Sequence, residues 1–130
     1  MKYEWLEDYL LKKPGAEHDY KIEWHWDRYM VRGKLFAAII PPPENMKNEI
    51  YNGHPLVNLK CDPRLAEGFR DQYPDILPGF YCDKRCWVAV RLDGEVPDEV
   101  LMSLCDMSYG LIVEKLPKYV QRELVGENEL

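Results

Sequence analysis

The most informative absence in this 130-residue chain is threonine, which does not occur at all. Serine is almost as scarce, because Ser103 and Ser108 are the only two and both lie in a strongly periodic helical stretch. A hydroxyl nucleophile for an acyl-transfer triad therefore has no convincing candidate. The eight glycines form neither G-x-G-x-x-G nor the Walker pattern, so no backbone cradle for a nucleotide phosphate is expected. The sequence predicts a protein that is not an enzyme and that needs no cofactor.

Long apolar runs are missing as well. The longest, Leu35 to Ile40, is far short of the ~20 residues that cross a bilayer. The N-terminus carries acidic residues where a secretory signal would need a basic start followed by an apolar stretch. We therefore expect a cytoplasmic protein without membrane contact. In that compartment Cys61, Cys82, Cys86 and Cys105 are expected to be reduced thiols.

Positive charge is in deficit, since 17 Lys and Arg face 23 Asp and Glu and leave a formal net charge of −6. The averaged field repels phosphate, so any binding of nucleic acid must come from a local patch. The length and the 46% apolar content fit one hydrophobic core, and no repeat or linker divides the chain. Residues 1–130 are therefore expected to form one domain.

Helical spacing of apolar residues predicts three main helices. The first covers residues 2–13 and ends before Pro14-Gly15. Asp62 is a good N-cap and Pro63 suits the first helical turn, so the second helix is expected over residues 63–73. The third begins at Pro97 and carries the longest apolar stripe, and the tail that follows it is expected to add a short helix.

Aromatic and β-branched residues predict the strands. Arg32-Gly33 separates two of them as a tight hairpin turn would, and the second, Lys34 to Ile40, is apolar on both faces and is expected inside the sheet. An alternating strand is expected before the hairpin, with Tyr20, Ile22, Trp24 and Trp26 on one face and Asp19, Glu23 and Asp27 on the other. Further strands are expected at Leu56 to Cys61, Phe80 to Cys82 and Trp87 to Leu92, with Asp83 to Arg85 as a turn.

The order of these elements predicts an α+β fold with a mainly antiparallel sheet. Each helix has one apolar stripe, so all of them can pack on a single face of the sheet. The other face is left for water or for a partner. The proline-rich segment from Pro41 to Pro55 has no periodicity and predicts a long loop between two strands.

The stretch from Cys82 to Cys86 is the most suggestive of chemistry. A three-residue turn would set the two sulfurs opposite each other, beside Lys84 and Arg85, and nearby cations lower the pKa of a thiol. The spacing is not C-x-x-C, and a zinc site would need two more ligands from elsewhere in the chain. We expect ordinary cysteines, with a thiol or metal site at Cys82 and Cys86 as an alternative.

Alternation along two strands collects polar and aromatic side chains on the helix-free face. If Val57 and Leu59 face the helices, the side chains between and after them face away, and the same rule applies around Val88 and Val90. The residues predicted on that face are Asn58, Lys60, Trp87 and Arg91, with Lys84 and Arg85 in the adjoining turn. An indole, an amide and several cations suit stacking on a base and pairing with phosphates. A sheet face covered by the loop from Pro74 to Gly79 would show the same residues.

Short motifs in a fixed order resemble a known family over nearly the whole chain. They are Asn58 to Pro63, Tyr73-Pro74, Pro78 to Phe80, Lys84 to Trp87, Leu92 to Gly94, Val96 to Asp98, Ser108-Tyr109 and Lys115 to Lys118. The first helix ending at Pro14-Gly15 and the hairpin with Gly33-Lys34 and Phe36-Ala37 are similar too. Together these motifs resemble the MmcQ/YjbR family.

The resemblance implies a frataxin-like α/β sandwich and a DNA-binding role of the kind described as "double wing". This chain departs from the family in one motif, where Tyr81 and Cys86 stand in place of two histidines and Asp83 replaces an asparagine. Asp83 adds a charge that repels phosphate.

Three hypotheses follow from the sequence. The first is a non-enzymatic DNA-binding domain that acts through the basic and aromatic residues of the helix-free face. The second is a protein-interaction or small-ligand module that uses the same face, with the proline-rich loop as a lid or contact. The third is the thiol or metal site described above.

Overall fold

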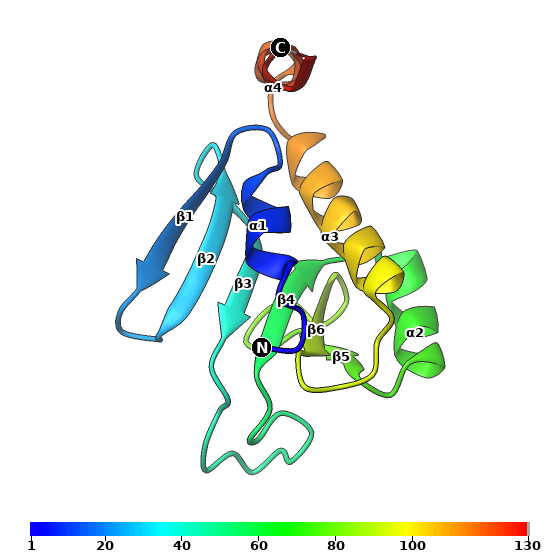
Figure 1. Ribbon diagram of the computed structural model, residues 1–130. Helices are drawn as coiled ribbons and strands as arrows, with labels where there is room; N and C mark the ends of the chain where they lie inside the picture. The colour runs from blue at the N-terminus through cyan, green and yellow to red at the C-terminus, as the bar shows by residue number, and fades with distance from the viewer. Residues whose placement is uncertain (130) are drawn as a thin grey trace.

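Six strands form one antiparallel sheet in the order β1-β2-β3-β4-β6-β5 (Figure 1). The computed structural model describes the backbone of residues 1–129 and the side chains of residues 1–126. The strands are β1 (Ala16–Lys21), β2 (Trp26–Val31), β3 (Lys34–Ile40), β4 (Leu56–Lys60), β5 (Ile76–Pro78) and β6 (Trp87–Arg91). β3 lies inside the sheet, as its two apolar faces predicted. The mainly antiparallel sheet is confirmed.

The first three helices pack on one face of this sheet and the last lies beyond its end, which confirms the predicted α+β arrangement (Figure 1). They are α1 (Leu6–Leu11), α2 (Pro63–Gln72), α3 (Asp98–Val113) and α4 (Lys118–Glu129). Each contributes buried apolar side chains to a core shared with the strands. In α3, Ser108 accepts a hydrogen bond from the Lys60 N–H at 2.8 Å and donates one to the Phe36 carbonyl, so one hydroxyl joins the helix to two strands.

Two local signals were read correctly from the sequence. Arg32 and Gly33 both have positive φ, 49° and 77°, as a tight turn joining β2 to β3 requires. The Asp62 carboxylate accepts a hydrogen bond from the Arg64 N–H at 2.9 Å and caps α2. Arg64 also pairs with this carboxylate, and these contacts lower the pKa of Asp62 to about 2.

The alternating strand expected around Trp24 was wrong in its centre. Residues 22–25 instead form the turn between β1 and β2, where the Trp24 N–H donates to the Lys21 carbonyl at 3.1 Å and His25 has φ 61°. Tyr20 and Trp26 therefore belong to two different, paired strands. β1 begins at Ala16, before the expected strand.

Two other boundaries differ from prediction. The first helix spans only Leu6–Leu11, because residues 4 and 5 form a turn rather than helix. Phe80 to Cys82 is not a strand, and the partner of β6 on that side is β5, within the segment expected as a loop. The connection between β5 and β6 is thus residues 79–86 rather than a three-residue turn.

The helix-free face of the sheet carries a second apolar core. Its buried members are Trp26, Ala38, Ile40, Tyr51, Leu56, Leu77, Phe80 and Ala89. Tyr51 comes from the loop between β3 and β4, and Phe80 comes from the loop between β5 and β6. This face is therefore covered by loops in place of helices. Within the described residues, no helix is both long enough and apolar enough to span a membrane.

Candidate functional site

Asn58 lies on the helix-free face, as the strand alternation predicted, but it is fully buried. Its Nδ2 donates to the Phe80 carbonyl at 2.6 Å, and the Phe80 N–H donates to its Oδ1 at 3.0 Å. The amide therefore fastens the residue 79–86 loop to the sheet. Asn58 was included among the nucleic-acid-binding residues, and in this structure its polar atoms have no path to a ligand.

Lys84 and Arg91 hold backbone carbonyls of the covering loops. Arg91 donates to the Ile50 carbonyl from Nε at 3.1 Å and from Nη2 at 2.8 Å, and it pairs with Asp75 at 3.3 Å. Lys84 Nζ donates to the Gly79 carbonyl at 2.8 Å. Both cations anchor loops, so a phosphate would have to compete with these contacts.

Lys84 and Arg85 are the exposed members of the predicted set, whereas Lys60 and Trp87 are half-buried. The Arg85 side chain is 86% exposed and pairs with Asp83 at 3.0 Å, which lowers the Asp83 pKa to about 2. Partial burial and the neighbouring Lys115 lower the pKa of Lys60. Trp87 is half-buried at the start of β6. The structure places these side chains in one region, as predicted. Fewer of their positive charges are exposed and unpaired than the sequence analysis expected.

The neighbouring cations do not activate Cys82, which argues against the alternative of a thiol site there. Burial raises the pKa of its thiol, and this effect outweighs the lowering contributions from Asn58 and Lys84. The Asn58 Nδ2 lies 3.4 Å from the Cys82 sulfur. Among the described residues, no three His, Cys, Asp or Glu side chains lie close enough together to hold a metal ion.

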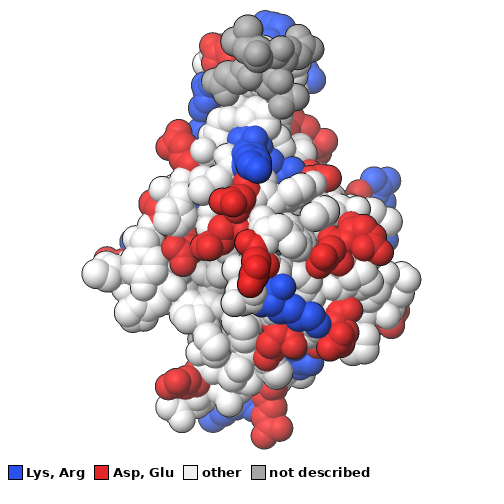
Figure 2. Space-filling model, in the orientation of Figure 1, with Lys and Arg blue, Asp and Glu red and all other residues white. Residues whose placement is uncertain are grey.

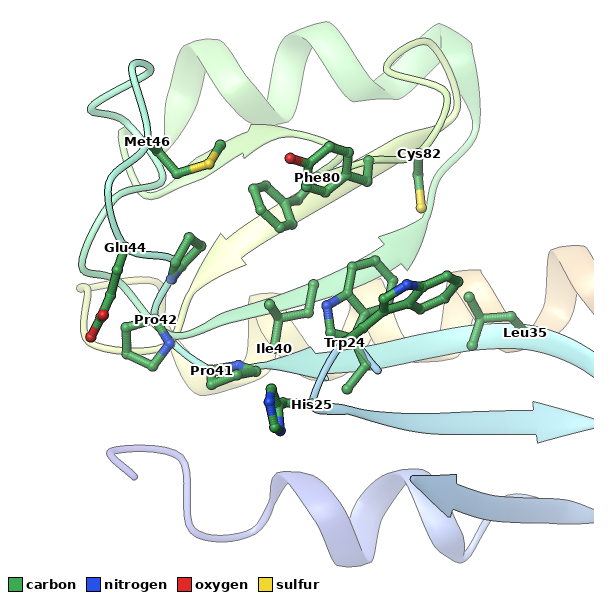
Figure 3. Close-up of a pocket in the computed structure, with 13 residues that line it drawn as sticks. Trp24, His25, Leu35, Ile40, Pro41, Pro42, Glu44, Met46, Phe80 and Cys82 are labelled. Atoms are coloured by element: carbon green, nitrogen blue, oxygen red, sulfur yellow. The ribbon is translucent and has the colours of Figure 1, made fainter. Parts of the chain in front are cut away.

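The second core opens at one side into a groove of about 780 Å³, which we call the aromatic groove. It is lined by Trp24, His25, Trp26, Leu35, Ile40, Pro41, Pro42, Pro43, Glu44, Met46, Phe80, Tyr81 and Cys82. Figure 3 shows Met46, Phe80 and Cys82 along one side and His25, Trp24, Ile40 and Leu35 along the other. Three connections and two strands therefore build it.

A row of four aromatic rings runs along the aromatic groove. The ring centroids are 5.2 Å apart from Trp24 to Trp26, 6.4 Å from Trp26 to Phe80 and 4.6 Å from Phe80 to Tyr81. Trp26 and Phe80 are buried, whereas Trp24 is 53% and Tyr81 78% exposed. The row therefore ends on each side in a large ring that water still reaches.

Backbone strain gathers at the same place. Within the described backbone, the non-glycine residues with positive φ are His25 (61°), Arg32 (49°), Asn45 (59°) and Tyr81 (54°). His25 and Tyr81 line the aromatic groove, and Asn45 lies between Glu44 and Met46, which also line it. Such conformations cost a bulky side chain free energy and often occur at binding sites. The exposed Tyr81 ring is held in position at this cost.

Charge is nearly absent from the lining. Of the described residues that line the aromatic groove, Glu44 is the only Asp, Glu, Lys or Arg. The face of the molecule drawn in Figure 2 carries more acidic than basic side chains, in keeping with the net charge of −6. The site therefore offers apolar contact and ring faces rather than phosphate-binding cations.

Sequence reasoning missed this groove because its walls come from separate segments. The sequence held one signal for it: aromatic residues occur next to segments without periodicity, at Trp24, Trp26, Phe80 and Tyr81. Their convergence depends on the turn at residues 22–25 and on Phe80 folding back over β4.

Comparison with known proteins gives a consistent result. The YjbR family profile matches residues 11–111. "Uncharacterized protein YjbR" of Escherichia coli strain K12 is 37% identical over 120 residues, covering 92% of this chain and 94% of that protein. "Uncharacterized protein YyaQ" of Bacillus subtilis strain 168 is 29% identical over 108 residues, covering 79% of this chain and 91% of that protein.

Solved structures share the fold. The crystal structure of Deinococcus radiodurans protein DR2400 matches with a TM-score of 0.75 at 26% identity, covering 92% of this chain and 84% of that one. A Pseudomonas syringae protein of known structure matches with a TM-score of 0.67 at 23% identity, covering 80% and 92% of the two chains. The resemblance read from the short motifs is confirmed, and the chain belongs to the YjbR family.

Proposed function

We propose that this chain is a non-catalytic binding protein whose ligand is a small organic molecule with a planar, apolar body, held in the aromatic groove. The observation that carries the proposal is the pair of exposed rings, Trp24 and Tyr81, at the two ends of the aromatic row. Large exposed rings beside a hollow are unfavourable in water and gain free energy when a flat apolar group covers them.

Size and lining support a small ligand. About 780 Å³ lies within the range of ~300–1,000 Å³ that small-molecule sites occupy. The walls combine aromatic rings, three consecutive prolines and aliphatic side chains, with few polar groups to fix orientation. A planar body can stack on the rings, because offset and edge contacts between π-systems are favourable.

Loop anchoring supports a largely preformed site. Tyr51 donates from its hydroxyl to the Pro78 carbonyl at 2.7 Å, and the Gly53 N–H donates to the Pro43 carbonyl at 2.7 Å. With the Asn58 contacts to Phe80, these bonds fix the two longer of the three connections that wall the aromatic groove. A site that is already ordered loses less entropy on binding.

A neutral fluorescent probe tests the proposal. N-phenyl-1-naphthylamine should bind saturably with enhanced fluorescence, and Trp24→Ala or Tyr81→Ala should weaken binding by roughly fivefold to a hundredfold, as loss of one stacking ring implies. Tyr119→Ala is the matched control, because Tyr119 is similarly exposed but lies on α4 and does not line the groove. Absence of saturable binding, or equal losses in all three variants, would refute the proposal.

Nucleic-acid binding is a second candidate, and one observation favours it. Lys60 and Lys115 are neighbours, and neither has a carboxylate partner within 4.0 Å among the described residues, while Arg85 is well exposed beside them. Lysines without a carboxylate partner suit a phosphate. Binding would pass through Lys60, Lys84, Arg85, Trp87 and Arg91.

Salt dependence tests this second candidate. Binding to single-stranded or duplex DNA should weaken steeply as salt rises, because counterions are released on association. The Lys84→Ala, Arg85→Ala double variant should bind more weakly, and Lys12→Ala, which removes an exposed lysine just after α1, is the control. If neither form of DNA binds at low salt, this candidate should be dropped.

A further inference from the structure

We infer that the ligand of the aromatic groove carries a positive charge, recognised by the ring faces and by Glu44; this inference rests on the proposed function. The first support is the charge of the lining. Among the described residues that form the walls, Glu44 is the only formally charged one at neutral pH, so the groove is negative and contains no ammonium or guanidinium. An anionic ligand would enter a negative site within a chain of net charge −6.

The second support is the behaviour of the protein's own cations. Lys21 Nζ lies 5.4 Å from the centroid of the Trp24 ring, and Lys84 Nζ lies 5.5 Å from that of Tyr51. Aromatic faces in and beside this region therefore already lie against ammonium groups, within the distance of a cation–π contact. Trp, Tyr and Phe faces gathered around a hollow are the usual means by which proteins bind organic cations.

Lys21 does not cancel this preference. Its ammonium lies 3.6 Å from the Glu23 carboxylate, so the pair is close to neutral, and neither residue lines the groove. Glu44 is exposed at the edge, where its attraction for a cation is screened by water. The rings are therefore expected to supply most of the preference for a cation, and Glu44 a smaller part.

The expected preference can be stated as a ratio of affinities. A cation over exposed rings gains about a twofold to thirtyfold advantage over a neutral group of the same shape. A single exposed carboxylate adds at most about fivefold. We expect a cationic ligand to bind at least about twofold more tightly than its neutral isostere.

Three probes with one shared body test the inference. They are (2-naphthylmethyl)trimethylammonium, the neutral 2-neopentylnaphthalene and the anionic 2-naphthylmethanesulfonate, titrated by calorimetry at pH 8, where histidine is mostly uncharged. The ammonium compound should bind most tightly and the sulfonate least. Glu44→Gln should weaken only the ammonium compound, by about twofold to fivefold, and Glu49→Gln is the control because Glu49 lies in the same loop but does not line the groove.

The outcomes separate this inference from the function on which it rests. Equal or tighter binding of the neutral or anionic probe overturns the inference and leaves the proposed function standing. An unchanged preference for the ammonium compound in Glu44→Gln overturns the part assigned to Glu44. Failure of all three probes to bind means that the proposed function itself is wrong.

Discussion

Replacing Asn58 with leucine removes both hydrogen bonds that hold Phe80 over the sheet while keeping the side chain close to its original volume. If the loop stays in place, the buried N–H and C=O of Phe80 lose their partners, at about 1–3 kcal/mol each. If the loop detaches, the two groups become hydrated, but the Phe80 ring loses its burial, at about 1.5–3 kcal/mol. The outcome with the lower cost prevails, so we expect the free energy of unfolding to fall by about 1.5–3 kcal/mol.

Urea unfolding followed by far-ultraviolet circular dichroism measures this change. For a domain of this size the loss corresponds to a midpoint lowered by roughly 1–2 M, with the protein still folded in water. Asn52→Ala is the control: its Oδ1 accepts from the exposed Met46 N–H at 3.0 Å, which water can replace, so a change of less than about 1 kcal/mol is expected. If the free energy of unfolding of Asn58→Leu lies within about 0.5 kcal/mol of the parent, the two hydrogen bonds from Asn58 do not hold the loop in place.

Asn58→Asp adds a pH signature that a packing defect would not give. The carboxylate cannot donate to the Phe80 carbonyl, and it is buried, so the pKa of this aspartate in the folded state should be raised. Protonation restores the missing donor. Stability is then fullest below the unfolded-state pKa of about 3.9 and is lost as the pH rises through the folded-state value. The variant should approach the parent near pH 4 and fall behind it at pH 7.

Two further predictions concern close packing and thiol access. A methyl group at Gly79 would lie 2.6 Å from the Trp87 Cβ, so Gly79→Ala should lower the free energy of unfolding by about 1–3 kcal/mol. Gly68 in α2 has open space around it, so Gly68→Ala should raise this free energy by about 0.5–1 kcal/mol. Similar changes in the two variants, measured by urea unfolding, would contradict the structure. Burial raises the thiol pKa of Cys61 to about 11 and that of Cys105 to about 12. Both thiols should therefore resist a thiol reagent in the native protein at pH 8 and react after denaturation. Rapid labelling of either cysteine in the native protein, measured by mass spectrometry, would contradict their burial.

Much of the fold was predictable because local chemistry and tertiary structure agree. The Arg32-Gly33 turn, the Asp62 cap and the stripe of α3 each depend on residues close together in sequence. The alternation in β4 also assigned Asn58 and Leu59 to the correct faces of the sheet. These signals need no knowledge of distant contacts.

The errors arose where distant contacts decide the structure. The alternation through Ile22 and Trp24 continues the pattern of a strand, yet the chain turns there. His25 adopts a positive φ in this turn, and the sequence has no glycine there that would have indicated it. β5 has only three residues and ends in a proline, so it becomes a strand only by pairing with β6. Neither feature has a local signature strong enough to predict.

The sheet face that carries the candidate site was predictable, but the aromatic groove itself was not, for the same reason. The sequence pointed to the helix-free face, and a covering loop was one of its two readings of that face. The cover is formed by Phe80 and Tyr51 rather than by the segment from Pro74 to Gly79 itself. Side-chain alternation predicts which face of the sheet a side chain lies on, but it does not predict which loop covers that face.

Because β3 is apolar on both sides, the sheet separates two apolar cores that share none of their buried residues. Substitutions in the loops that wall the aromatic groove leave the helix-side core untouched, since that core is built from other residues. A library randomised at Pro42, Glu44, Met46 and Tyr81 should retain folded proteins and change ligand preference, which makes this domain a starting point for engineered binders.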